Sequence, residues 1–296
     1  MPEKSLNWYL KTLTLKNEFT SYNWKFSHVP SELFYFSQWP IHSTIFLIYR
    51  CALSVYTFYG FVQSVAGFPD PMLPVRPWGV FLTNWAYFIL MLHCLCSFVT
   101  VLRHHLKVAK KVETNMEVII KLKEKSSSQV WSNQVPKLVK LNWFLFALAA
   151  PTALLVTIVY FKALYPLKKI NYIPIGDFHM HLMNSIIILM EVSINAIPVR
   201  LQHVIYPMIL GGMYSVFSYI YWSLDPPNNV IYRGVVDWAY PLRAFLTCLF
   251  LACALLPLLH LFLYILFRFR LFIFQACHID RQLVIISYAD GDVRND

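Results

Sequence analysis

The chain has 296 residues, of which 58% are hydrophobic and only 14% are charged, and its formal net charge is +10. Soluble domains are about 25% charged, so this composition excludes an ordinary soluble protein and indicates a membrane protein. The basic residues gather between the apolar runs, which favours contact with membrane lipids and excludes a nucleic-acid partner.

Long apolar runs recur along most of the sequence, and a helix of about 20 apolar residues can cross a bilayer. Six runs qualify, and they predict an all-α fold, a polytopic transmembrane helix bundle over residues 41–267. A cytosolic N-terminal segment, 1–40, precedes this bundle, and a cytosolic C-terminal tail, 268–296, follows it. The predicted spans are, in chain order, 41–66, 80–102, 141–164, 178–197, 204–222 and 241–267.

The placement of lysine and arginine predicts the orientation, because the loops that carry these residues stay on the cytosolic side. With both termini in the cytosol, 18 of these residues face the cytosol, six face outside and Arg50 lies within the first span. Much of this cytosolic excess of lysine and arginine lies in a basic loop, 103–140. Residues 108–122 of the loop can form a surface helix. We therefore expect a multi-pass protein of the plasma membrane or the endoplasmic reticulum; the sequence does not indicate its oligomeric state.

The fourth predicted span is the most polar of the six. On a helical projection, several of its polar residues and one just before it share an arc of about 80°; these residues are Asp177, His181, Asn184, Glu191 and Asn195. Such a face must contact protein or water rather than lipid. One interpretation is therefore helix packing, in which each polar side chain is paired with a neighbouring helix.

Catalysis by Thr83 and His181 is a second interpretation. In this topology the second and fourth spans both enter from the outer side, and each of the two residues lies about one turn inside its span. The two side chains would share one depth if those helices are neighbours. A threonine hydroxyl becomes a nucleophile when a base takes its proton, and a neutral imidazole is such a base. Asp177, one turn before His181 on the same face, would orient the ring.

Metal binding and transport are two further interpretations. Asp177, His179 and His181 are potential ligands, but on a helix His179 points away from the other two, and no cysteine partner lies nearby. We expect neither a metal nor another cofactor. A transporter is less favoured, since no inverted repeat or pair of broken helices marks a binding site at the membrane midplane.

Motifs in and next to the second, fourth and fifth spans, and one before the sixth span, resemble those of a known family. They are Phe81-Leu82-Thr83-Asn84-Trp85, His181-Leu182-Met183-Asn184-Ser185, Ile197-Pro198-Val199-Arg200, His203, Tyr206-Pro207, Gly211, Tyr214, Tyr221-Trp222 and Asp237-Trp238. Over about residues 40–270 the chain resembles the rolling stone family of multi-pass membrane proteins, named for a part in muscle-cell fusion. The resemblance implies a role in cell–cell fusion of the myoblast type. Leu182 stands where that family often has glycine.

The same positions carry a more distant resemblance. The matching residues are Trp78-x-x-Phe81-Leu82-Thr83, Met180-His181, Glu191, Pro198-x-Arg200 and Trp238-x-Tyr240-Pro241. They are similar to the androgen-induced family of intramembrane threonine hydrolases, which cleave fatty acid esters of hydroxy fatty acids. The resemblance implies that Thr83 is the nucleophile, His181 the base and a lipid ester the substrate. Asp177, Phe178 and Leu182 depart from the histidine motif of that family, Asn-His-x-Met-His-Thr.

Three other polar residues are candidates for supporting roles in such a reaction. Asn84 or Asn184 would stabilise the oxyanion that forms on the ester carbonyl. Arg50 would hold a fatty-acid carboxylate, or would instead pair with Glu191 in a salt bridge.

Overall fold

The computed structural model describes residues 18–19, 24–27, 29–66, 77–119, 135–168 and 171–292, and its regular elements are helices. Most of the predicted segment 1–40 and residues 120–134 of the basic loop 103–140 lie outside the described residues. The fold is all-α, as the sequence predicts. Within the described ranges, extended pairing is limited to isolated bridges between Ser37 and Asn195 and between Tyr232 and Val236.

Five helical stretches of the described chain are long and apolar enough to cross a membrane. They correspond to the first, second, third, fifth and sixth predicted spans. Their helices are α3 (Ser43–Ala66), α4 (Leu82–Ile119), α5 (Lys137–Val159), α8 (Ile205–Leu224), α9 (Pro241–Phe250) and α10 (Leu256–Asp292). The helix of the second span therefore continues through the first part of the predicted basic loop.

The fourth predicted span is also helical, but it is not one of these five stretches because its polar residues lower its hydropathy. It consists of α6 (Ile175–Asp177), a π-helical turn η5 (Phe178–Met183) and α7 (Asn184–Ile194). Asn195 has an extended backbone, with ψ 169°, and ends the helix three residues before Pro198. The apolar side chains of Ile187 and Ile188 on α7 are fully buried, so this polar segment lies inside the bundle.

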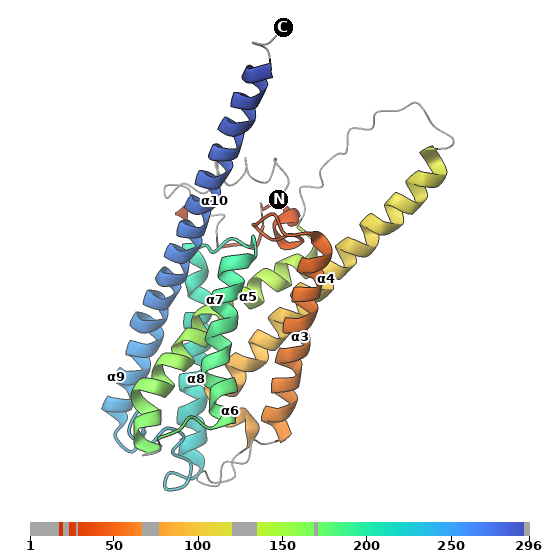
Figure 1. The fold of residues 1–296 in the computed structure, drawn as a ribbon. Helices are drawn as coiled ribbons and strands as arrows, with labels where there is room; N and C mark the ends of the chain where they lie inside the picture. Colours follow the sequence, from red (N-terminus) through yellow and green to blue (C-terminus); the bar gives the residue numbers. More distant parts are fainter. Residues whose placement is uncertain are drawn as a thin grey trace.

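The centre of the bundle is α5, the most buried of the five stretches. It packs against α4, α7, α8 and α10 (Figure 1). Pro151 lies within this helix and is itself buried. A proline is tolerated in such a helix because neighbouring helices can satisfy the backbone groups that it frees.

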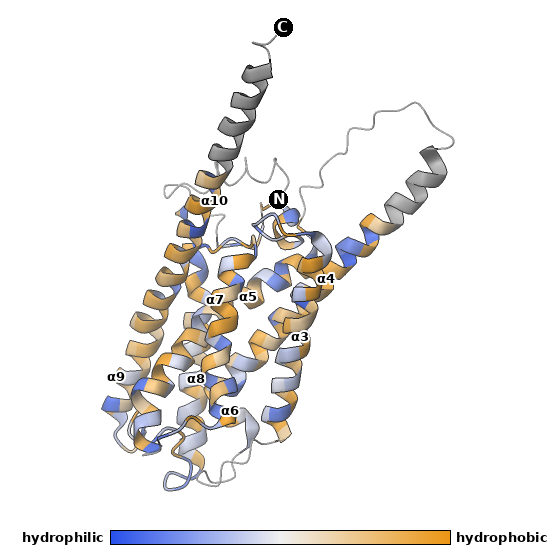
Figure 2. Ribbon diagram, in the orientation of Figure 1, coloured by the Kyte–Doolittle hydropathy of each residue, from blue (hydrophilic) through white to orange (hydrophobic). Residues whose placement is uncertain are grey.

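The outer faces of the bundle are apolar, as lipid contact requires. Figure 2 shows hydrophobic residues along most of α9 and along the coloured part of α10. Leu242 and Phe245 on α9 and Met213 on α8 are all more than half exposed. An aqueous surface would rarely carry so large an apolar area, so these faces are suited to the hydrocarbon of a bilayer.

The segment between α8 and α9 folds back onto the bundle. Gly234 takes a positive φ of 84° in a tight turn next to the bridge between Tyr232 and Val236. The hydroxyl of Tyr232 accepts a hydrogen bond of 2.9 Å from the backbone N–H of Leu82. This contact joins the segment to the first turn of α4, next to Thr83.

Candidate functional site

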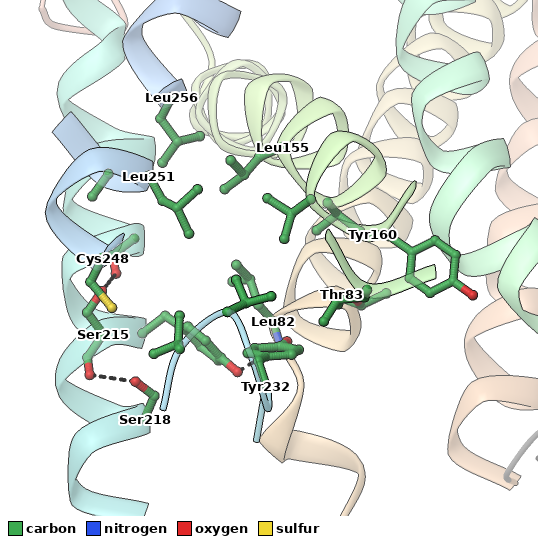
Figure 3. A pocket seen from close by; sticks show the side chains of 18 of the residues that line it. Leu82, Thr83, Leu155, Tyr160, Ser215, Ser218, Tyr232, Cys248, Leu251 and Leu256 are labelled. Atoms are coloured by element: carbon green, nitrogen blue, oxygen red, sulfur yellow. Dashed lines mark hydrogen bonds between the residues drawn. The ribbon is translucent and has the colours of Figure 1, made fainter. Parts of the chain in front are cut away.

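A cavity of about 70 Å³ lies where the start of α4, the end of α5, α8, α9 and the segment 225–240 meet. Most of its lining is apolar, including Leu82, Leu155 and Leu251. Figure 3 shows Thr83 and Tyr232 on one side of this space and Leu251 and Leu256 on the other. A single water needs about 10–15 Å³, so the cavity holds more than one water-sized group.

All three π-helical turns in the described part of the chain contribute to this lining. They are η5, η3 (Tyr160–Leu164) at the end of α5, and η7 (Leu251–Leu255) between α9 and α10. The lining residues that they supply are His181, Tyr160, Leu164, Leu251 and Ala252. A π-helical turn costs regular hydrogen bonding and is frequent at functional sites. Their convergence on one cavity favours a functional site over a packing gap.

Thr83 and His181 both line this cavity. Thr83 is half-buried in the first turn of α4, and His181 lies in η5. No hydrogen bond joins the threonine hydroxyl to the imidazole in this structure. The Nδ1 atom of His181 is buried and has no hydrogen-bond partner among the described residues. A buried polar atom without a partner is uncommon in proteins and is available for a ligand or substrate.

The ring of His181 is held by residues from two elements. The Tyr160 ring stacks on it face to face, with centroids 3.7 Å apart and planes within 5°. The Tyr160 hydroxyl points away from the cavity and donates to Asp177 Oδ2 (Figure 3). Asp177 Oδ1 lies 3.8 Å from His181 Nε2, and Lys168 Nζ donates to Asp177 Oδ2 at 2.7 Å. Asp177 therefore faces the Nε2 side of the ring and leaves Nδ1 unpaired.

The predicted asparagines have local partners. Asn84 Nδ2 donates to the carbonyl oxygen of Trp78 at 2.5 Å. Asn184 Nδ2 donates to the Met180 carbonyl at 2.9 Å, and its Oδ1 accepts from Thr157 at 3.1 Å. Neither asparagine lines the cavity. Tyr232 does, and its hydroxyl is a donor that the sequence does not single out.

Arg50 and Glu191 are brought together elsewhere in the bundle. Arg50 Nη1 contacts the two carboxylate oxygens of Glu191 at 2.6 and 2.5 Å, and both side chains are buried. His93 Nε2 lies 3.1 Å from the same carboxylate, Tyr49 donates to it at 2.9 Å and Asn195 at 3.2 Å. These contacts form a buried polar cluster that connects α3, α4 and α7. Neither Arg50 nor Glu191 lines the cavity.

The three potential metal ligands do not converge. His179 Nδ1 lies 2.5 Å from the hydroxyl of Tyr56 on α3, whereas Asp177 and His181 both contact Tyr160 on η3. Among the described residues, no group of three histidine, cysteine, aspartate or glutamate side chains could hold a metal ion.

Comparison with known proteins identifies the family. A family model described as "Protein rolling stone" matches residues 7–286. A curated relative from Drosophila melanogaster, also called Protein rolling stone, is 26% identical over 236 residues, which cover 76% of this chain and 78% of the relative. No solved structure matches. Because the family model spans most of the sequence, this chain belongs to the rolling stone family.

Proposed function

We propose that this rolling stone family protein is an intramembrane hydrolase of lipid esters, with Thr83 as nucleophile and His181 as base. One observation carries the proposal: both residues line the same apolar cavity, and the Nδ1 atom of the imidazole is buried without a hydrogen-bond partner among the described residues. Fatty acid esters of hydroxy fatty acids are the proposed substrate class, taken from the resemblance to the androgen-induced family. Catalytic hydrogen bonds often form only when substrate binds, so the missing Thr83–His181 bond is compatible with this role.

In the proposed reaction, Thr83 Oγ1 attacks the ester carbonyl carbon while His181 Nδ1 takes the hydroxyl proton. The tetrahedral intermediate collapses, the imidazolium returns this proton to the departing alkoxide, and an alcohol and an acyl-threonine result. Water then attacks the acyl group with His181 as base, which releases the fatty acid and restores Thr83. Asp177 and Tyr160 would keep the ring in place through both steps.

The hydroxyl of Tyr232 is the proposed oxyanion donor. It lines the cavity and accepts the N–H of Leu82, the residue before Thr83. Donors at such a position stabilise the charge that develops on the carbonyl oxygen. We assign this role to Tyr232 rather than to Asn84 or Asn184, because the two asparagines have local partners outside the cavity.

An activity-based fluorophosphonate probe tests the proposal. We expect the full chain in membranes to be labelled, and Thr83→Ala and His181→Ala to abolish labelling at equal expression, because the probe reacts with an activated hydroxyl. Thr247→Ala is the matched control, since Thr247 is, like Thr83, a half-buried threonine, but it lies on α9 outside the cavity. Absence of wild-type labelling, under conditions that label a known threonine hydrolase, would contradict the proposal.

Family membership favours a second function, action in cell–cell fusion of the myoblast type. The polar residues would then serve helix packing, and membrane lipids would be the medium rather than the substrate. The two functions are compatible, because a fusion factor can act through lipid chemistry. A cell-mixing assay separates them: fusion that is unchanged by Thr83→Ala does not depend on hydrolysis. The protein would lie in the plasma membrane or the endoplasmic reticulum, with both termini in the cytosol.

A further inference from the structure

A second groove lies at the opposite end of α5 from the Thr83 cavity. Its volume is about 520 Å³, and its walls are residues 24–27, the first turns of α5 and the start of α8. From α5 come Lys140, Leu141 and Phe144, and from α8 comes Tyr206. About 20 residues of helix, or roughly 30 Å, separate Lys140 from Tyr160, so the groove is independent of the proposed catalytic site.

Aromatic contacts hold residues 24–27 against the two helices. The Phe26 ring lies 5.1 Å from that of Tyr206 and 5.7 Å from that of Phe144. The Tyr206 hydroxyl donates to the backbone carbonyl of Trp24 at 2.5 Å. The groove is therefore a built feature of the fold.

Basic and hydrogen-bonding groups lie at the polar side of this groove. Lys25 and Lys140 are exposed, and among the described residues neither makes an ion pair. Its lining contains no acidic residue. The Oγ of Ser27 is buried and has no hydrogen-bond partner in the described part of the chain. Two ammonium groups are thus exposed to an anion, and the buried Ser27 hydroxyl has no competing partner among the described residues.

Apolar surface continues from these groups along the start of α5. Leu141 is 46% exposed, and Phe144 lies one turn further into the span. A free phosphate would use the lysines alone, whereas a phospholipid would also cover Leu141 and Phe144 with an acyl chain. In the proposed orientation this end of the bundle faces the cytosolic leaflet, where anionic lipids are concentrated.

We propose that this groove binds an anionic phospholipid, with its phosphate between Lys25, Lys140 and the Ser27 hydroxyl. The lipid would hold the N-terminal segment to the starts of α5 and α8. The binding site requires no catalysis and stands whether or not Thr83 is a nucleophile.

Native mass spectrometry of the full chain in neutral detergent tests this site. Dioleoyl phosphatidylglycerol and dioleoyl phosphatidylcholine are the probes. We expect the wild type to bind phosphatidylglycerol preferentially, and the variant Lys25→Ala/Lys140→Ala to bind it about tenfold more weakly, because each lysine attracts an anionic headgroup. Ser27→Ala, which leaves the charge unchanged, should weaken binding about threefold.

The charge-matched control is Lys162→Ala/Arg233→Ala, which removes two exposed basic residues from the other end of the bundle. It should bind phosphatidylglycerol as the wild type does. Equal weakening in both double variants, or no preference for phosphatidylglycerol in the wild type, would overturn the proposal. Competition by the headgroup alone, glycerophosphoglycerol, at the affinity of the whole lipid would also overturn it, because the apolar wall would then have no part.

Discussion

Replacing Glu191 by alanine is expected to destabilise the folded bundle by about 3–5 kcal/mol, because it leaves a buried arginine without a counter-charge. Arg50 is 2% exposed, and it contacts the two oxygens of this carboxylate. His93, Tyr49 and Asn195 would lose the same acceptor. The measurement is the thermal unfolding midpoint of the detergent-solubilised protein, followed by size-exclusion chromatography after heating.

Two variants make that measurement specific. Asp225→Ala removes an exposed carboxylate at the end of α8 and should change stability by about 0.5 kcal/mol or less. Arg50→Met/Glu191→Leu removes both charges and should be less damaging than Glu191→Ala alone, because no unpaired charge stays buried. An unfolding midpoint of Glu191→Ala equal to that of the wild type would show that the buried polar cluster does not stabilise the bundle.

Tyr232→Phe is expected to lower kcat for lipid-ester hydrolysis by about 10²–10³, the usual effect of removing one oxyanion donor. The substitution keeps the aromatic ring and removes only the hydroxyl, which accepts the N–H of Leu82, the residue before Thr83. The initial rate of fatty-acid release, divided by the amount of folded protein, measures this effect.

Removing the hydroxyl also leaves the Leu82 N–H without its acceptor, so stability must be measured in parallel. Tyr219→Phe is the matched control, because Tyr219 lies half-exposed on the outer face of α8. Unchanged kcat in Tyr232→Phe would refute the oxyanion role. An equal loss in both variants would indicate a general effect of tyrosine substitution on the bundle.

Hydropathy predicts the helix bundle well, because bilayer thickness sets the length of a span. It does not predict that α4 continues to Ile119, since residues 103–119 are polar but contain many good helix formers. It also does not reveal the position of Arg270, which belongs to the predicted tail. In the structure Arg270 is buried and donates to the carbonyls of Val192 and Asn195 at the end of α7. A contact between two helices that are far apart in the sequence leaves no periodic pattern in the sequence of either helix.

The candidate site is predictable in part. Counting turns from the outer ends of two spans puts Thr83 and His181 at one depth, and both line the cavity. The stack of Tyr160 on His181 is not predictable, because it depends on π-helical turns that alter the rotation of both helices. Tyr232 comes from the segment between α8 and α9, which folds back onto the bundle and turns at Gly234. A sequence pattern specifies neither the rotation of a helix about its axis nor the return of a connecting segment to the bundle.

The most direct test of the central claim is to look for the acyl-threonine intermediate. The full chain is incubated with a fatty acid ester of a hydroxy fatty acid, quenched in acid and mapped by peptide mass spectrometry. Our account predicts an acyl group on Thr83 in the wild type and its loss in His181→Ala, which lacks the base. Ester cleavage by the wild type without acylation of Thr83, or with acylation at another residue, would contradict it.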